Sequence, residues 1–307
     1  MARFLQWSDL HREFGLNIPY PLPTKECPAG SIDAILIAGD LHSGIEHVYS
    51  MIAIQHEWEV PVISIRGNHE YYHQNVQESE AEQRELFEKA RALGHDIRLL
   101  DREVAIIGDT RILGCTLWTD FDLIGDRMNV MTGSRFMMND YRKVRFTENG
   151  RERQLQPEDT RERHQCDRSW LLGELARPSS NRTLVMTHHI PVPEALAAES
   201  GKADYSPAYC SDMRADILDK KVDIWVSGHS HWARRGTLPG LHGPIAFTSN
   251  MQGYPRQRTN FEPYRVIDTN CPTRDLEPIG INEPCLAHLK NADEIVAALR
   301  LEEPAAP

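Results

Sequence analysis

Histidine and carboxylate residues gather in five short motifs along this chain, and these residue types are suited to binding divalent metal ions. Each motif follows a run of apolar residues: Asp9-Leu10-His11, Gly39-Asp40, Gly67-Asn68-His69-Glu70, His188-His189 and Gly228-His229-Ser230-His231. Carboxylate oxygens, imidazole nitrogens and an amide oxygen are good ligands for first-row divalent ions. Two such ions side by side can clamp the attacking and leaving oxygens of a phosphate ester. The motifs therefore favour two-metal hydrolysis of phosphate esters.

Each of the first two motifs has a simpler explanation when it is taken alone. Asp9 and His11 are two residues apart beyond an apolar run, where strand alternation would send both side chains the same way. With 14 histidines and 45 acidic residues in the chain, such a triplet also arises by chance in a solvated turn. Asp40 ends the apolar run 34–39, where a buried carboxylate needs a partner to offset its desolvation. A helix N-cap would also explain Asp40.

The third motif is more specific. Gly67 permits a tight turn after the apolar run 60–65, and Asn68 offers a neutral oxygen ligand. His69 has an ordinary pKa near 6.5, so it can act as a general acid or as a cation facing a phosphate. A structural hydrogen bond within the turn is the alternative for His69. Because five motifs follow predicted strands in an order that suits one two-metal site, coincidence is a poor explanation of the set.

Short β-rich runs alternate with helix-like segments, which indicates a layered α/β fold with at least part of its sheet parallel. We predict strands at 4–7, 34–38, 60–65, 104–107, 112–118, 183–186, 223–226 and 245–248. We predict helices at 45–57, 76–93, 167–176 and 212–220, and a C-terminal helix capped by Asn291. In the helix at 76–93, one apolar face is predicted from Leu86, Phe87, Ala90 and Leu93.

Two segments interrupt this alternation. The segment 15–30 contains four prolines and is predicted to be a stiffened loop. The segment at about 120–165, with Met128, Met131, Met137 and Met138, is either a cap that shapes a binding cleft or an ordinary surface insertion with buried methionines. We predict one domain over 1–270 that includes this insertion, and a C-terminal extension over 271–307 with a short helix packed on the same domain.

Composition narrows the classes of function. The chain has 307 residues, of which 40% are hydrophobic, so it can bury a substantial core. The formal charge of −11 and the scattered basic residues argue against strong binding of long nucleic acid. The six cysteines form no CxxC pair and are predicted to be reduced thiols. The first residues reach Ser8-Asp9 too early for a signal peptide, and no apolar run approaches the ~18 residues of a membrane span. We therefore predict a cytoplasmic location and no membrane partner.

The complete set of motifs resembles the signature of the calcineurin-like metallophosphoesterase superfamily: Asp-x-His, Gly-Asp, Gly-Asn-His-Glu, a lone His and Gly-His-x-His. The resemblance spans about residues 1–270. Further segments are similar to a bacterial branch whose members mostly lack an assigned substrate: 68–72, 116–121, 139–142 and 253–255. The resemblance implies a four-layer α/β fold, in which a β-sandwich of two sheets is flanked by helices. It places the site where the carboxyl ends of the strands converge.

The resemblance also implies two divalent metal ions (Mn, Fe, Zn or Ni) that are bridged by Asp40. The first ion would be held by Asp9, His11, Asp40 and His231, and the second by Asp40, Asn68, His188 and His229. His69 matches the catalytic histidine near the leaving-group oxygen. His188 is preferred to His189 because the pattern His-x-x-Pro fits His188 and Pro191. Two ions about 4 Å apart would share a water, lower its pKa toward 7 and so generate the attacking hydroxide.

The expected partner is a small phosphorylated substrate, a phosphodiester or a phosphomonoester, with a nucleotide as one candidate. We predict substrate contacts from His189, Arg142, Tyr71 and His164, with Arg12 and Tyr72 as further candidates; guanidinium groups match phosphate oxygens bidentately. A surface ion pair is the alternative for either arginine, and a structural role is the alternative for His189. A nuclease or a protein phosphatase of the same superfamily is the alternative. A non-catalytic scaffold is a fourth hypothesis, although scaffold relatives lose ligands and none is lost here. A β-lactamase-like metallohydrolase would need His-x-His-x-Asp-His, which the chain lacks.

Overall fold

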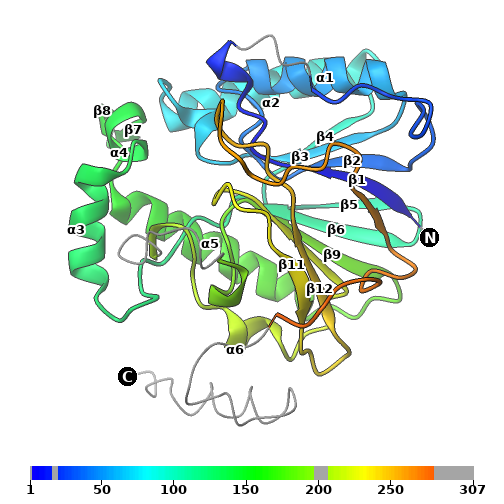
Figure 1. Ribbon diagram of the computed structural model, residues 1–307. Coiled ribbons are helices and arrows are strands. Elements are labelled where there is room, and N and C mark those ends of the chain that lie inside the picture. The colour runs from blue at the N-terminus through cyan, green and yellow to red at the C-terminus, as the bar shows by residue number, and fades with distance from the viewer. Residues whose placement is uncertain (1, 16–19, 197–206, 280–307) are drawn as a thin grey trace.

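Two β-sheets pack face to face in the computed structural model, which describes residues 2–15, 20–196 and 207–279. Helices cover the outer face of each sheet, so the layers run helix, sheet, sheet, helix (Figure 1). This is the four-layer α/β sandwich that the resemblance implied. Within the described residues, no helix is long and apolar enough to cross a membrane.

The first sheet has the strand order β13-β1-β2-β3-β4, with β1 to β4 parallel and β13 antiparallel at the edge. Its strands are β1 (Arg3–Trp7), β2 (Ala34–Ile37), β3 (Val62–Ile65), β4 (Ile97–Leu100) and β13 (Val266–Asp268). The outer face is covered by α1 (Glu46–Trp58) and α2 (Val76–Ala92) (Figure 1). Because both faces of β2 and β3 are covered, all of their residues are buried, and all of them except Ser64 are apolar.

The second sheet has the order β11-β12-β10-β9-β6-β5, in which the four central strands are parallel and the two edge strands antiparallel. Its strands are β5 (Glu103–Ile107), β6 (Thr110–Cys115), β9 (Arg182–Thr187), β10 (Ile224–Ser227), β11 (Arg235–Leu238) and β12 (Ile245–Ser249). On the outer face of this sheet lie α5 (Pro157–Leu175) and the short α6 (Arg214–Ile217) (Figure 1). In β10, Ile224 and Val226 face the layer between the sheets, whereas Trp225 packs in the cluster that includes α5 and α6.

The insertion between β6 and α5 folds into a cap of its own. It consists of α3 (Arg127–Met137), α4 (Asp140–Lys143) and the hairpin of β7 (Arg145–Glu148) and β8 (Arg151–Gln154), and it projects at the left of Figure 1. Its apolar cluster joins Tyr141, Val144 and Leu155 to Tyr71 and Tyr72, which directly follow the third motif. Of the methionines that the sequence analysis considered buried in an ordinary surface insertion, Met131 is buried, whereas Met128 and Met137 are exposed. The cap is therefore attached directly to one of the five motifs.

Several predicted element boundaries are corrected. The strand predicted at 112–118 ends at Cys115, because Leu117 and Trp118 have positive φ. The helix predicted at 167–176 begins at Pro157, and the helix predicted at 212–220 is only the single turn α6. The strands β4, β11 and β13 were not predicted. Leu93 is 81% exposed, so the apolar face predicted for 76–93 ends at Ala90.

The structure tests the prediction of reduced cysteines and describes part of the C-terminal extension. Cys27, Cys115, Cys166, Cys210 and Cys271 are free thiols, as predicted, and Cys285 lies outside the described residues. The predicted helix at Asn291 and most of the extension 271–307 also lie outside them. Of the extension's described part, Ile279 packs into the cluster beneath the second sheet.

Two short 3-10 helices, η1 (Arg12–Phe14) and η2 (His69–Tyr71), directly follow or overlap the first and third motifs. A third, η3 (Pro193–Ala195), comes after the fourth. In the described part of 15–30 there is no helix or strand, as predicted for a loop with four prolines.

Candidate metal centre

All five motifs lie just beyond the carboxyl ends of the parallel strands β1, β2, β3, β9 and β10. Backbone hydrogen bonds join them within each sheet: Asp9 N donates to the Gly39 carbonyl at 3.0 Å, and Gly228 N donates to the His188 carbonyl at 3.0 Å. Between the sheets, the backbone N–H of His229 donates to the carboxylate of Asp9 at 3.0 Å. The motifs therefore form one site at the common edge of the sandwich.

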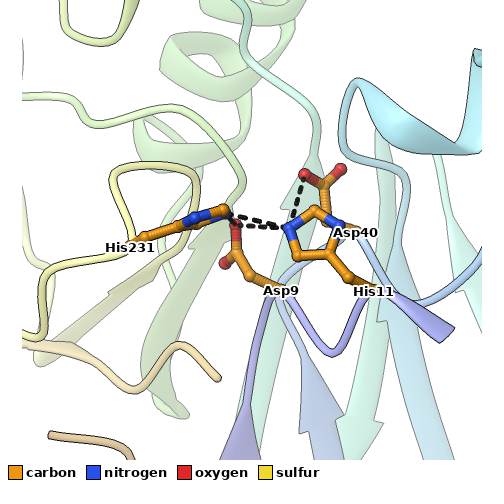
Figure 2. Close-up of side chains that lie close together, drawn as sticks. All are labelled: Asp9, His11, Asp40 and His231. Carbon is orange, nitrogen blue, oxygen red and sulfur yellow. Dashed lines mark hydrogen bonds and ion pairs between the residues drawn. The ribbon is translucent and has the colours of Figure 1, made fainter. Parts of the chain in front are cut away.

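The first cluster of this site contains Asp9, His11, Asp40 and His231, all of them buried. Figure 2 shows the four side chains pointing toward one another. Nε2 of His11 lies 2.9 Å from Nε2 of His231 and 3.8 Å from Oδ2 of Asp40. Nε2 of His231 lies 3.2 Å from Oδ1 of Asp9. Two imidazole nitrogens and two carboxylates facing one another are a suitable set of ligands for a divalent cation.

The second cluster contains Asp40, His188 and His229, and Asn68 joins it through its amide oxygen. Nε2 of His188 lies 3.4 Å from Oδ2 of Asp40 and 3.0 Å from Oδ1 of Asn68. Nε2 of His229 is buried and has no hydrogen-bond partner. A buried polar atom left in this way costs free energy, and a bound cation would satisfy it. The residues of the second cluster therefore also fit a metal ion.

Asp40 belongs to both clusters. Its Oδ2 faces His11 on one side and His188 on the other, while its Oδ1 accepts a hydrogen bond from the backbone N–H of His69 at 2.9 Å. Burial raises the pKa of Asp40, but the neighbouring His188 and His69 outweigh burial and hold it well below its usual value. An ionised carboxylate between two clusters is suited to bridging two cations. The structure thus groups the seven predicted ligands as the resemblance implied, and their metal-binding roles are a prediction that metal analysis tests.

Three of the histidines have their Nδ1 atoms held by other groups, so that Nε2 is directed to the site. The partners are Glu13 Oε1 at 3.0 Å from His11, the Ala38 carbonyl at 2.8 Å from His188, and Gln257 Oε1 at 2.7 Å from His231. Metal-binding histidines commonly donate their second ring N–H in this way, which fixes the tautomer and the ring orientation. This arrangement supports the metal-binding interpretation independently of the sequence motifs.

The backbone of the site is strained at five of the seven predicted ligands. Positive φ angles occur at Asp9 (52°), His11 (46°), Asp40 (54°), His229 (73°) and His231 (57°). A non-glycine residue in this region costs on the order of 1 kcal/mol or more, and such residues concentrate at functional sites. The angles also correct the reason given for Asp9 and His11: β1 ends at Trp7, and left-handed turns, not strand alternation, bring the two side chains together.

The glycines of the motifs leave room for the ligands. A Cβ atom on Gly67 would overlap Oδ1 of Asp40 and would lie 2.6 Å from Cε1 of His188. Gly39 has a φ of +84°, and its Cβ would lie 2.6 Å from the backbone nitrogen of Gly67. Only glycine therefore fits at positions 39 and 67, where these two turns meet.

His69, the predicted general acid, lies beside both clusters. Its Nδ1 is 2.7 Å from Oε1 of Glu13, its Nε2 is 3.0 Å from the hydroxyl of Tyr254, and its ring stacks on Tyr72. Burial lowers the pKa of His69, but the carboxylates of Asp40 and Glu13 raise it more, so the net shift is upward. A raised pKa favours the protonated form that a general acid requires.

The sequence analysis gave no role to two buried or partly buried carboxylates that organise the site. Glu13 holds Nδ1 of both His11 and His69. Glu70 accepts backbone hydrogen bonds from Gly67 at 2.6 Å and from Asp40 at 3.1 Å, which ties the second and third motifs together. Glu70 is the last residue of the third motif, and Glu13 comes two positions after the first motif. This closeness to the motifs is the sequence signal that indicates a role for both carboxylates.

A cleft of about 400 Å³ opens over the two clusters. Its lining includes His69 and Tyr72, whereas the four predicted substrate contacts do not line it, and their roles stay a prediction. Each of the four makes other contacts in the structure. The Tyr71 hydroxyl donates to Glu80, and His164 Nδ1 donates to the Leu117 carbonyl. Arg142 is exposed and donates to the Asn139 side chain, and His189 is buried against His229. Arg12 stacks over Tyr20 and also does not line this cleft.

The profile of calcineurin-like phosphoesterases matches residues 2–233, a range that contains all five motifs. The chain belongs to this family. It is 24% identical to uncharacterized protein L509 of Acanthamoeba polyphaga mimivirus over 220 residues, which cover 67% of this chain and 73% of that protein. The crystal structure of the phosphopantetheinyl hydrolase PptH from Mycobacterium tuberculosis has a similar fold, with a TM-score of 0.54 and 17% identity. The match covers 82% of this chain and 90% of the other. This calcineurin-like phosphoesterase is therefore a metal-dependent hydrolase of phosphate esters.

Proposed function

We propose that this phosphoesterase hydrolyses small phosphodiesters and that its two clusters each hold one divalent ion. The observation that carries the proposal is the cleft of about 400 Å³, whose lining comes from two separate parts of the chain as well as from the predicted ligands. Met137, Met138 and Asn139 belong to the cap, whereas Trp232 and Gln257 belong to the segments that follow β10 and β12. A diester has one substituent on each side of its phosphorus atom, so it needs space on both sides of the ions.

The charge of the lining supports the same preference. Apart from the predicted ligands and His69, the described residues that line the cleft are uncharged: Tyr72, Met137, Met138, Asn139, Tyr209, Ser230, Trp232, Tyr254 and Gln257. A phosphodiester carries a single negative charge, whereas a monoester carries close to two at neutral pH. The aromatic and methionine side chains are suited to packing against apolar or aromatic substituents. The proposed substrate is therefore a small diester with at least one such substituent.

The ligands, His69 and Glu13 have different roles in the proposed reaction. Bound divalent ions would lower the pKa of a water and neutralise charge on the phosphoryl oxygens. Asp40 and the other predicted ligands would hold these ions. His69 faces the cleft beside them and is positioned to donate a proton to the leaving oxygen. Glu13 keeps the ring of His69 in place through Nδ1.

The test compares bis(p-nitrophenyl) phosphate with p-nitrophenyl phosphate. The metal-stripped protein is assayed alone and after Mn²⁺ is added, and the bound metal is counted in each sample. We expect Mn²⁺-dependent hydrolysis with a higher kcat/KM for the diester. A higher kcat/KM for the monoester would overturn the proposed substrate class. Failure to cleave either ester with two ions bound per chain would contradict hydrolysis of small esters altogether.

Two variants locate the substrate. Trp232→Ala removes an aromatic ring from the cleft and is expected to raise KM for the aryl diester by about 10-fold, which corresponds to a loss of ~1.4 kcal/mol of binding. Arg142→Ala, outside the cleft, is the matched control and is expected to leave KM unchanged. If Arg142→Ala raises KM and Trp232→Ala does not, the substrate binds elsewhere.

A further inference from the structure

The cap reaches the metal centre through one carboxylate. Asp140, the first residue of α4, is 3% exposed, and its Oδ1 accepts a hydrogen bond from Nδ2 of Asn68 at 2.6 Å. The other end of the same amide, Oδ1 of Asn68, lies 3.0 Å from Nε2 of His188. The amide of Asn68 is therefore held between the cap and the second cluster.

The orientation of this amide decides whether Asn68 can bind a cation. The two ends of an amide have nearly the same shape, but only the oxygen is a ligand, and the NH₂ group would repel a metal ion. An ionised carboxylate only accepts hydrogen bonds, so Asp140 selects the orientation in which NH₂ faces the cap. The Tyr72 hydroxyl, at 3.4 Å from Nδ2, is a more distant acceptor. Asp140 is thus the main group that directs the amide oxygen to the cluster.

The burial of Asp140 supports the same interpretation. Its side chain is almost fully buried, and its partner at 2.6 Å is the neutral amide of Asn68. Among the described residues, no lysine or arginine forms an ion pair with Asp140. A buried carboxylate without a cationic partner is costly, and a cation held by the other end of Asn68 would reduce that cost.

The cap holds Asp140 firmly in this position. The hydroxyl of Tyr141 lies 2.9 Å from the hydroxyl of Thr160 in α5, and His73 N donates to the carbonyl of Lys143 at 2.9 Å. These contacts fix α4 both to α5 and to the segment that follows the third motif. Asp140 is consequently preorganised and not a mobile surface group.

We propose that Asp140 is a positioning residue for the second metal ion, and that the cap completes the metal centre by fixing the Asn68 amide. This proposal rests on the metal-binding role of Asn68. It gives the inserted segment a function besides lining the cleft. Side chains that orient metal ligands typically change metal affinity by about 10- to 100-fold when they are removed.

The experiment measures Mn²⁺ binding without substrate, by calorimetric titration and by metal analysis of the full-length protein. Asp140→Ala is expected to weaken the second Mn²⁺ by about 10- to 100-fold while the first stays unchanged. Asp140→Asn keeps the shape and one acceptor oxygen, so a smaller loss is expected. Tyr141→Phe is the matched control: it removes the neighbouring hydrogen bond to Thr160, makes no contact with Asn68, and is expected to bind both ions normally.

An exchange of the two groups gives a second, independent test. In the double variant Asn68→Asp with Asp140→Asn, the carboxylate becomes the metal ligand and the new amide donates to it. We expect this variant to bind the second Mn²⁺ more tightly than Asp140→Ala does. Thermal unfolding in EDTA, recorded for every variant, identifies any that fail to fold.

Unchanged affinity for the second ion in Asp140→Ala would overturn the proposal. So would an equal loss of both ions in Asp140→Ala and Tyr141→Phe, because that pattern indicates only general damage to the cap. Failure of the proposed function gives a different result: both ions are bound normally by the unmodified protein, and no diester is cleaved.

Discussion

Oε1 of Glu13 accepts a hydrogen bond from Nδ1 of His69 at 2.7 Å. The same oxygen lies 3.0 Å from Nδ1 of His11, so one carboxylate orients both the predicted general acid and a predicted metal ligand. Burial raises the pKa of Glu13, but the hydrogen bonds from the two histidines prevail and lower it to about 2. Glu13 is therefore ionised at neutral pH, and its effect on the site can be tested by removing its charge.

Glu13→Gln keeps the size of the side chain but weakens its hold on both imidazole rings. We expect kcat for diesters to fall by about 10- to 100-fold, as is typical when a group that orients an active residue is lost. The fall should be larger for phenyl than for p-nitrophenyl leaving groups, because a poorer leaving group depends more on protonation. Steady-state kinetics with both esters check this, and a kcat within twofold of the unmodified protein for both would contradict it.

His69→Ala removes the proposed general acid without removing a metal ligand. The expected result is a fall in kcat of about 10² to 10⁴ with little change in bound metal. Kinetics and elemental analysis of the same preparation separate the two effects. Full activity would exclude His69 from the mechanism, and loss of both ions would show that its role is structural.

Asp40→Asn removes the charge of the predicted bridging ligand. We expect fewer than two Mn²⁺ ions per chain, because both clusters share this carboxylate. Asp126→Asn, an exposed position outside the clusters, is the control and should bind two ions. Metal analysis after gel filtration measures the difference, and two ions per chain in Asp40→Asn would argue against the bridge.

Gly67→Ala places a methyl group where Asp40 and His188 already lie. We expect a destabilisation of about 1–3 kcal/mol, as for overpacking in a core, together with weaker metal binding. Gly133→Ala in α3 is the matched control: its Cβ meets nothing within 4 Å, and a stabilisation of about 0.5–1 kcal/mol is expected. Chemical denaturation of both variants checks this, and equal stability of the two would contradict the close packing at Gly67.

The pH dependence of stability has a contribution from Asp167, which lies far from the ligands along the chain. Burial raises the pKa of Asp167 to about 6, despite the nearby Arg102. The folded protein then binds more protons than the unfolded chain between about pH 4 and 6, so this group's contribution to stability falls as the pH rises through that window. Relative to Asp167→Asn, the unmodified protein should lose about 2 kcal/mol of unfolding free energy from pH 4.5 to 7.

That comparison is made by urea denaturation in EDTA, so that metal release does not contribute. Asp167→Asn is a suitable reference because its amide oxygen can still accept the hydrogen bond that Leu117 N now donates at 2.8 Å. A free-energy difference between the two proteins that is constant from pH 4.5 to 7 would show that the pKa of Asp167 is not raised.

The sequence predicts the ligand groups well because type and spacing are local properties. Buried parallel strands end at one edge of a sheet, so motifs that follow them meet, as Asp9 and His229 do across 220 residues of sequence. Burial of individual side chains is not local, and for that reason Tyr71 and His164 were assigned to the substrate although they are buried in the packing of the cap and of α5. The first turns of α5 were missed because Glu158, Asp159 and Arg161 show no apolar periodicity.

The contact of Asp140 with Asn68 also cannot be predicted from the spacing of residues in the sequence. The two residues are 72 positions apart, and Asp140 belongs to an inserted segment that has no counterpart in the strand–helix alternation. The resemblance of the segment 139–142 to the bacterial branch points to this region, but the sequence alone favours Arg142 as its functional residue. The structure instead directs Arg142 to Asn139 on the surface and Asp140 to the metal centre.

The most direct test of the central claim is an anomalous difference map from crystals of the Mn²⁺-loaded protein. Two bound ions bridged by Asp40 should give two peaks about 4 Å apart. One should lie among Asp9, His11, Asp40 and His231, and the other among Asp40, Asn68, His188 and His229. A single peak, or peaks away from Asp40, would contradict a two-metal centre bridged by this carboxylate.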